Sequence, residues 1–173
     1  MPEMCTDGWQ GRALVVGGGG IGRALQAELS QRHPTLLVTL ATRHPLTAEE
    51  WNLDLESSSS LAELTAQLSA DNHPLRIVIN ATGRLHSPLY QPEKRLQHVE
   101  QSALIDSFAI NAAGPLLLAK SVEPVLTRDR PFHFASLSAR VGSIGDNRSG
   151  GWYAYRAAKA AQNMLLRSLS LEW

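Results

Sequence analysis

Two side chains near the end of the chain have the types and the spacing of an acid–base pair. Tyr155 and Lys159 stand four residues apart in WYAYRAAKAAQ, so on a helix they lie one turn apart on the same face. A phenol has a pKa of about 10, and a neighbouring ammonium lowers it by favouring the phenolate. We therefore expect Tyr155 to exchange a proton with a substrate while Lys159 supports it. Tyr153 has Ala157 at the matching position and lacks such support.

Ser138 is the candidate for the group that polarises a substrate oxygen. Its hydroxyl can donate a hydrogen bond to an oxygen on which negative charge develops. Ser136 and Ser143 are alternatives, and alternation along the expected strand puts Ser136 on the same face as Ser138. A purely structural serine that satisfies local backbone groups is a further alternative.

Asn111 is a candidate because of the proline that follows it. Pro115 lies four residues later and has no amide hydrogen, so in a continuous helix the main-chain carbonyl of Asn111 loses its usual donor. A buried free carbonyl favours binding of a water molecule. The alternative is an ordinary proline kink with the side chain of Asn111 facing solvent.

A glycine-rich turn, VVGGGGIGRAL, has the G-x-G-x-x-G pattern at Gly17, Gly19 and Gly22. An apolar run precedes it and a helical pattern follows, as in dinucleotide-binding turns. The three glycines would permit a tight turn, close approach of a pyrophosphate and close helix packing. The amides that open the helix, around Gly20 and Ile21, would then hold the phosphates. The alternative is a flexible loop or a tight structural turn.

The residues after the second apolar run indicate which dinucleotide is preferred. An acidic residue that would bind a ribose 2′-hydroxyl is absent from LATRHP, which instead contains Thr42 and Arg43. Arg43 can pair with a 2′-phosphate, and Arg23 is a second cation near the turn. Both arginines can alternatively be solvated surface charges. The pattern favours NADP(H) over NAD(H).

Strand and helix patterns alternate along the chain. Apolar strands are expected at 12–17, 35–41, 51–55, 75–81 and 130–138, and helices at 21–33, 61–70 (capped by serines 57–60), about 100–127 and 153–172. This order predicts an α/β fold, a Rossmann-type doubly wound parallel sheet between two helix layers (three-layer α/β/α), in a single domain over 1–173.

Composition bounds the partners. Sixteen basic and sixteen acidic residues balance, so neither a nucleic acid nor a membrane is an expected partner, and a small molecule is. One cysteine, Cys5, and scattered histidines predict no metal and no internal disulfide. No signal peptide is apparent, and no apolar stretch is expected to span a bilayer, so we expect a cytoplasmic protein.

Together these motifs resemble the short-chain dehydrogenase/reductase family, from Arg12 to Trp173. NATG (80–83) resembles its Asn-Asn-Ala-Gly, INAAGP (110–115) its active-site asparagine segment and YRAAK its Tyr-x-x-x-Lys. The stretch 137–161, LSARVGSIGDN to GGWYAYRAAKAA, is similar to bacterial C-factor-type small reductases. Departures are a shorter glycine turn, Ala81 for the second asparagine, and a longer spacing, since Tyr155 stands 17 positions after Ser138.

The resemblance implies an NADP(H)-dependent oxidoreductase that interconverts a carbonyl and an alcohol by hydride transfer, and a homo-oligomer, with Tyr155 as the acid/base. It implies catalytic roles for Ser138, Tyr155, Lys159 and Asn111. It implies cofactor-binding roles for Gly17, Gly19, Gly20, Ile21, Gly22, Arg43, Asp54, Asn80, Ala81, Gly83, Tyr155 and Lys159.

Family chains continue beyond the last helix, so the resemblance leads us to expect a C-terminally truncated domain that lacks the usual last strands. Roughly a quarter to a third of a usual chain would be absent. By the same resemblance, most of the region that shapes the substrate pocket would be among the missing parts. The alternative function is a non-catalytic NADP-binding or interaction module that retains the site residues.

Overall fold

The computed structural model describes residues 10–88, 90–127 and 130–173. The chain divides into two compact units. Unit 1 consists of Met1–Thr82 and Ala119–Ser136, and unit 2 of Gly83–Leu118 and Leu137–Trp173. The expectation of a single domain over 1–173 stays a prediction.

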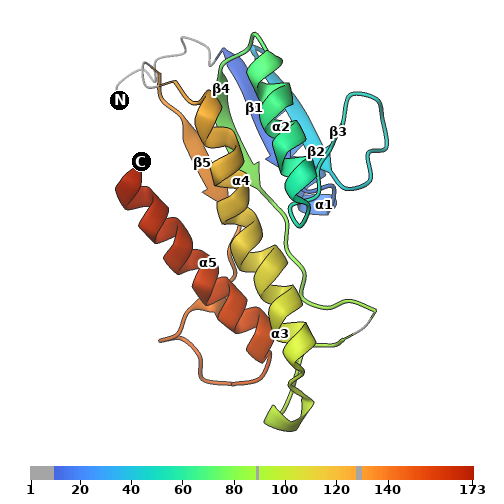
Figure 1. The fold of residues 1–173 in the computed structure, drawn as a ribbon, viewed down its shortest axis with the longest axis vertical. Coiled ribbons are helices and arrows are strands. Elements are labelled where there is room, and N and C mark those ends of the chain that lie inside the picture. The colour runs from blue at the N-terminus through green and yellow to red at the C-terminus, as the bar shows by residue number, and fades with distance from the viewer. Residues whose placement is uncertain (1–9, 89, 128–129) are drawn as a thin grey trace. The chain divides into compact units, whose positions relative to one another are not determined.

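A five-stranded parallel sheet is the centre of unit 1 (Figure 1). Its strands are β1 (Gly11–Val16), β2 (Leu36–Thr42), β3 (Trp51–Asn52), β4 (Leu75–Asn80) and β5 (His133–Ser136), in the order β3-β2-β1-β4-β5. Every residue of β1 is buried, as expected for a central strand that is covered on both faces. Strand order reverses beside β1, which defines a Rossmann-type sheet and confirms the predicted fold class.

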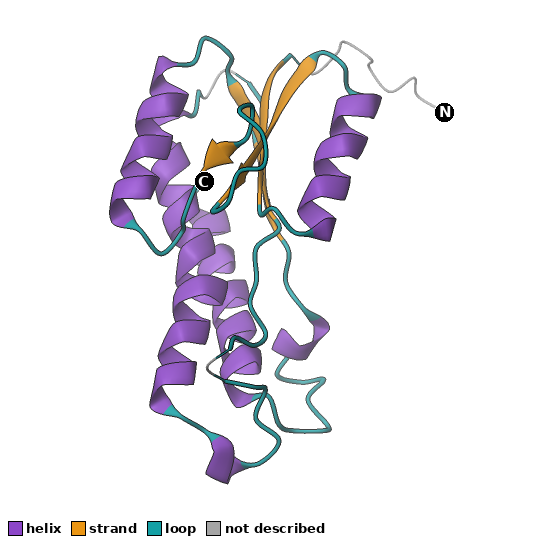
Figure 2. Cartoon of the chain, turned by 90° about the vertical axis from the view of Figure 1, so that its right-hand side faces the viewer, coloured by secondary structure: helices purple, strands orange, loops and turns teal. Residues whose placement is uncertain are grey.

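Helices cover both faces of this sheet. Figures 1 and 2 show α1 (Gly20–Arg32) on one face and α2 (Ser58–Ala70) on the other, which confirms the three layers. The predicted serine cap of α2 is present, since the hydroxyl oxygen of Ser57 accepts a hydrogen bond from the Ser60 amide at 3.2 Å. Leucines at helical spacing (Leu61, Leu64 and Leu68) are the buried apolar residues of α2.

Two strands are shorter than the sequence predicts. The expected strand 51–55 ends at Asn52, because the amide of Asp54 donates to the Ser60 hydroxyl instead of to a strand. The expected strand 130–138 covers only His133–Ser136, because the carbonyl of Leu137 accepts side-chain hydrogen bonds from Lys159 and Gln162. Tertiary hydrogen bonds of polar groups, and not hydrophobicity, therefore determine where β3 and β5 end.

Helices make up most of unit 2. The predicted last helix is confirmed as α5 (Tyr153–Glu172), and it packs against α3 (Gln101–Phe108). A π-helical turn (Ala109–Ala113) joins α3 to α4 (Gly114–Val122). The boundary between the two units falls inside α4, after Leu118. In this turn the Gly114 amide donates to the carbonyl of Ala109, five residues back. The helix therefore continues through Pro115 with a change of register.

One helix is a longer apolar stretch than we expected from the sequence. Among the described residues this helix, Gln101–Val125, is long and apolar enough to span a bilayer by length and composition alone. Half of its apolar window is buried within the protein. It also carries the buried polar side chains of Ser107 and Asn111. We therefore interpret it as a core helix of the fold, whose mixture of apolar and polar residues hid its length in the sequence.

A buried ion pair stabilises the amino-terminal end of the sheet. The guanidinium of Arg12 on β1 hydrogen-bonds Asp71 and Thr39 and lies 4.7 Å from the centre of the Trp51 ring. Burial by itself raises the pKa of Asp71, but hydrogen bonds from Arg12 and His73 outweigh it and hold that pKa at about 2. The folded state therefore favours the charged carboxylate.

Replacing this carboxylate should remove an acid-dependent part of the stability. Because the pKa of Asp71 falls from 3.8 to about 2 on folding, its contribution is complete above about pH 4 and is lost as the pH falls toward 2. We expect Asp71→Asn to lower the free energy of unfolding by about 2 kcal/mol at pH 5 and by almost nothing at pH 2. Urea unfolding at both pH values measures this.

Asp146→Asn is the control, because Asp146 pairs with Arg140 in an exposed ion pair. It should change the unfolding free energy little at either pH. A constant difference between Asp71→Asn and wild type across this pH range would contradict the prediction.

Candidate active site

The glycine turn of unit 1 joins β1 to α1 and leaves the start of the helix open. Gly17 has φ +120°, a conformation that suits glycine, and a Cβ on Gly22 would lie 1.8 Å from the Gly17 carbonyl oxygen. At Gly19 and Gly20 an added Cβ would meet no atom within 4 Å. No side chain caps α1, whose first turn contains no acidic residue. Ile21, the next residue, is exposed. The first turn of α1 therefore presents uncapped backbone amides with room for an anion.

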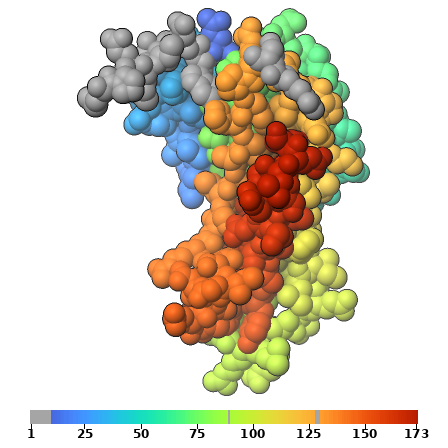
Figure 3. Space-filling model, turned by 90° about the vertical axis from the view of Figure 1, so that its left-hand side faces the viewer, coloured from blue at the N-terminus to red at the C-terminus, as the bar shows by residue number. Residues whose placement is uncertain are grey.

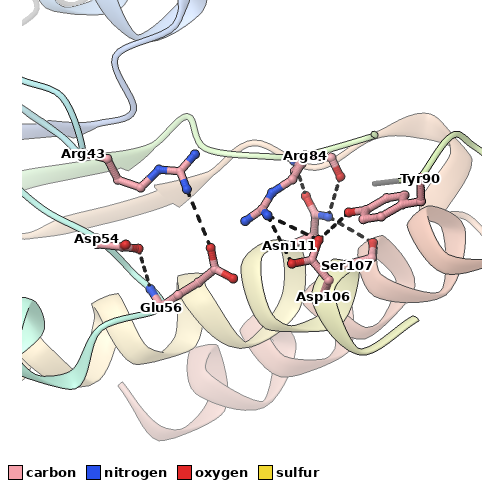
Figure 4. A network of polar contacts seen from close by, with 8 residues as sticks. All are labelled: Arg43, Asp54, Glu56, Arg84, Tyr90, Asp106, Ser107 and Asn111. Atoms are coloured by element: carbon pink, nitrogen blue, oxygen red, sulfur yellow. Dashed lines mark hydrogen bonds and ion pairs between the residues drawn. The ribbon is translucent and has the colours of Figure 1, made fainter. Parts of the chain in front are cut away.

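Two arginines lie near the turn, and each has an acidic partner. Arg23 binds Glu50 at 2.6 Å and also donates to the Gly18 carbonyl, while about a third of its side chain (34%) stays exposed. Arg43 lies 3.9 Å from Glu56, and half of its side chain is exposed (Figure 4). The carboxylate of Asp54 accepts the Glu56 amide at 2.9 Å.

Asn80 and Ala81, at the end of β4, have structural contacts in unit 1. The wholly buried Asn80 donates to the Ser136 hydroxyl at 2.9 Å, and its oxygen accepts the amide and hydroxyl of Thr82. The Ala81 amide donates to the Val16 carbonyl at 2.8 Å. Asn80 therefore links β4 to β5, which supplies a brace although Ala81 replaces the second asparagine of the family motif.

Asn111 lies in the π-helical turn of unit 2 and is 1% exposed. Its carboxamide oxygen accepts the Arg84 amide at 2.8 Å, while its nitrogen donates to the Arg84 carbonyl at 2.8 Å and to the Ser107 hydroxyl. Figure 4 shows this pairing beside Asp106, which binds both the Arg84 guanidinium and the Tyr90 hydroxyl. The alternative of a solvent-facing side chain is wrong, because the amide is used to hold a loop.

Gly83 lies between Asn111 and Lys159. A Cβ at this position would lie 3.4 Å from the carboxamide oxygen of Asn111 and 3.6 Å from Nζ of Lys159. The amide of Asn111 and the ammonium of Lys159 therefore both lie within ordinary contact distance of this position. Unit 2 therefore brings together three predicted site residues that are far apart in the sequence.

Tyr155 and Lys159 lie on the same face of α5, with Nζ 5.9 Å from the centre of the phenol ring. Lys159 is only 2% exposed and donates to the Leu137 carbonyl at 3.0 Å and to the side-chain oxygen of Gln162 at 2.8 Å. Burial lowers the pKa of Lys159 and raises the pKa of Tyr155. The expected lowering of the Tyr155 pKa was wrong, because the ammonium is directed to other acceptors and desolvation dominates.

Ser138 lies beyond the end of β5, so the expected strand alternation does not apply to it. Its exposed hydroxyl donates to the side-chain oxygen of Asn163 on α5 at 2.7 Å. Ser136 belongs to unit 1, where its hydroxyl accepts from Asn80, and Ser143 is exposed. Of the three serines, Ser138 and Ser143 share unit 2 with Tyr155.

Sequence reasoning missed two buried polar residues of unit 2. Glu93 accepts the Ala154 amide on its carboxylate at 3.3 Å and the Trp152 amide on its main-chain carbonyl. It thereby caps α5 just after Trp152, which has the left-handed φ of 53°. Gln162 hydrogen-bonds Lys159. A glutamine one turn after the lysine was a usable signal for Gln162, whereas nothing local distinguished Glu93.

No group of three or more metal-ligating side chains occurs among the described residues, and Cys5 lies outside them. The predicted site residues fall into two sets. Unit 1 contains the glycine turn, Arg43, Asp54, Asn80 and Ala81, and unit 2 contains Gly83, Asn111, Ser138, Tyr155 and Lys159.

Comparison with known proteins identifies the family. A family model for short chain dehydrogenase matches residues 12–173. This chain belongs to the short-chain dehydrogenase/reductase family. This agrees with the sequence motifs and with the Rossmann-type sheet.

Curated relatives of this short-chain dehydrogenase include C-signal of Myxococcus xanthus, 39% identical over 77 residues, or 44% of this chain and 46% of that protein. An uncharacterized oxidoreductase of Schizosaccharomyces pombe is 28% identical over 92% of this chain and 66% of its own length. The 1-hydroxy-2-glutathionyl-2-methyl-3-butene dehydrogenase of Rhodococcus is 32% identical over 67% of this chain and 48% of its length. The chain thus spans about half to two thirds of these relatives.

Solved structures share the fold. A carbonyl reductase from Pseudomonas aeruginosa in complex with NADP has a TM-score of 0.76 at 23% identity, covering 95% of this chain and 74% of that one. The aldohexose dehydrogenase of Thermoplasma acidophilum has a TM-score of 0.77 at 18% identity, covering 95% and 62%.

The cap on α5 should respond to loss of the Glu93 carboxylate. We expect Glu93→Ala to lower the free energy of unfolding by about 1–2 kcal/mol and to speed hydrogen exchange at the Ala154 amide. Urea unfolding and amide exchange followed by NMR measure both effects. Glu100→Ala, at an exposed position, should leave the Ala154 exchange rate unchanged. Equal rates in Glu93→Ala and wild type would refute the cap.

Proposed function

We propose that this short-chain dehydrogenase is an NADP(H)-dependent oxidoreductase that interconverts a carbonyl and an alcohol. The observation that carries this proposal is the arrangement in unit 2, where the Lys159 ammonium lies 5.9 Å from the centre of the Tyr155 ring and both the ammonium and the Asn111 amide border Gly83. A binding module would have no need for a phenol beside a buried ammonium. Ser138 is the proposed fourth member of this group.

The fit of unit 1 to a dinucleotide rests on the open glycine turn. A phosphate group fits beside Gly19 and Gly20, where no atom fills the space of a Cβ, and accepts hydrogen bonds from the first amides of α1. When bound, the cofactor supplies or accepts the hydride. Asp54, Asn80 and Ala81 of unit 1 are further proposed cofactor-binding residues, as are Gly83, Tyr155 and Lys159 of unit 2.

Proton transfer is assigned to the phenol of Tyr155. Because burial raises its pKa, Tyr155 is protonated at neutral pH in the free chain and is ready to donate to a carbonyl oxygen. The positive charge of Lys159 stabilises the phenolate that remains after the transfer. Ser138 must turn its hydroxyl from Asn163 toward the substrate oxygen in order to stabilise the developing charge.

Arg43 is the proposed ligand of the 2′-phosphate, which favours NADPH over NADH. Its guanidinium is half exposed and 3.9 Å from Glu56, too far for a strong hydrogen bond, so a phosphate can compete for it. The Pseudomonas aeruginosa carbonyl reductase, solved with NADP, supports this choice of cofactor by analogy.

Self-association through unit 2 is also proposed. Large apolar side chains are exposed on α3 and α5, namely Leu104, Ile105, Phe108, Met164 and Leu171. Figure 3 shows the carboxyl-terminal turns of α5 on the molecular surface. Among the alanines of α5, Ala154 and Ala158 are buried within unit 2 and Ala157 is exposed. We propose a homo-oligomer in the cytoplasm acting on a small-molecule substrate.

Removing the phenolic hydroxyl tests the enzyme assignment. We expect Tyr155→Phe to lower kcat for NADPH-dependent reduction of small aldehydes and ketones by about 100-fold or more, since the proton donor is lost. The Kd for NADPH, from cofactor fluorescence, should stay within twofold. Tyr153→Phe, on the same helix, should leave both unchanged. Undiminished turnover in Tyr155→Phe would remove Tyr155 from the mechanism, and wild type without turnover would favour the non-catalytic module.

A charge change at Arg43 tests the cofactor preference. We expect Arg43→Gln to weaken NADPH binding about 10-fold or more, as loss of a charge-assisted hydrogen bond predicts, and to leave NADH binding unchanged. Parallel fluorescence titrations with the two cofactors measure this. Arg32→Gln, at the exposed end of α1, is the matched control. An equal loss for both cofactors would show that Arg43 does not read the 2′-phosphate.

A further inference from the structure

Gln162 is a wholly buried polar side chain on α5, one turn after Lys159. Its side-chain oxygen accepts a hydrogen bond from Nζ of Lys159 at 2.8 Å, and its nitrogen donates to the Leu137 carbonyl at 3.2 Å. An amide nitrogen that donates to a carbonyl leaves the oxygen to face the ammonium. The orientation of Gln162 is therefore fixed by its neighbours.

The ammonium of Lys159 depends on neutral oxygens. Its two acceptors are the side-chain oxygen of Gln162 and the Leu137 carbonyl, and among the described residues no carboxylate pairs with it. An ammonium that is 2% exposed loses most of its hydration, so each remaining acceptor carries a large share of its stabilisation. Burial lowers the pKa of Lys159, in agreement with this environment.

We propose that Gln162 is a positioning residue that holds the Lys159 ammonium beside Tyr155. The contact exists independently of the reaction, but its consequence for catalysis rests on the proposed function. The groups that face the ammonium are Tyr155 from α5, the carbonyl of Leu137 after β5 and the amide of Asn111 across Gly83. Of these only Tyr155 titrates. An apolar residue at position 162 would remove one of two acceptors without adding a charge.

NMR of the chain labelled with [15N]lysine tests this contact directly. The sequence has three lysines, and Lys94 and Lys120 are exposed, so they are internal references and can be assigned with Lys94→Arg and Lys120→Arg. We expect Gln162→Met to lower the pKa of Lys159 by about one unit or more, because the charged form loses a hydrogen bond. Gln162→Glu should raise it, because a carboxylate favours the ammonium.

Shifts of the Lys159 pKa in opposite directions in the two Gln162 variants would indicate positioning. A purely structural role of Gln162 would not produce shifts of opposite sign. Gln162→Glu keeps the shape and an acceptor oxygen, so it tests the proposal even where Gln162→Met does not fold. Gln67→Met, the same substitution at an exposed site of α2, is the matched control and should leave the pKa of Lys159 unchanged. Unchanged values in both Gln162 variants would overturn the proposal.

The pH profile of kcat/KM with NADPH provides the catalytic readout. We expect the alkaline limb to move to lower pH in Gln162→Met and to higher pH in Gln162→Glu. If the NMR shifts occur while wild type reduces no carbonyl, the proposed function fails and the contact stands. If wild type turns over and both profiles match it, the positioning role fails and the proposed function stands.

Discussion

Burial of the Lys159 ammonium is the constraint on which unit 2 depends. A cation inside protein needs oxygen acceptors at hydrogen-bond distance, and the fold supplies them from the Leu137 carbonyl and from Gln162. The same need ends β5 at Ser136, since the next carbonyl serves the lysine instead of a ladder. Gly83 lies beside both the ammonium and Asn111, at distances where a Cβ would make ordinary contact with each. One charge thereby shapes a strand end and a helix face.

In unit 1, backbone groups and not side chains form most of the predicted cofactor site at the glycine turn. The turn after β1 is so tight that the Gly17 carbonyl occupies the space of any side chain at Gly22, and the helix amides beyond it are left without a cap. The nearby cations are already paired, Arg23 closely with Glu50 and Arg43 more loosely with Glu56. An anion entering here competes with Glu56 for Arg43, so selectivity for a 2′-phosphate depends on both residues.

Local patterns were sufficient for most of the fold. The alternation of apolar runs and helical periodicity predicted the parallel sheet and its two helix layers, and the last helix was placed at its observed bounds. Errors occurred where tertiary contacts override propensity. The strand at 51–55 stops at Asn52 because the Asp54 amide donates to the hydroxyl of Ser60 in the first turn of α2, and the long helix at 100–127 contains a π-helical turn before Pro115. The bond to Ser60 has no signal within 51–55, whereas Pro115 did mark the place where the long helix is irregular.

The sequence by itself determined the order of elements, the open glycine turn and the shared face of Tyr155 and Lys159, because each depends on residues within a few positions of one another. Only the tertiary structure decided the direction of the Tyr155 pKa, the pairing of Asn111 with the Arg84 backbone and the capping of α5 by Glu93. These depend on desolvation and on partners tens of residues away. Spacing predicts which side chains can meet, whereas burial decides which charges they hold and which acceptors they use.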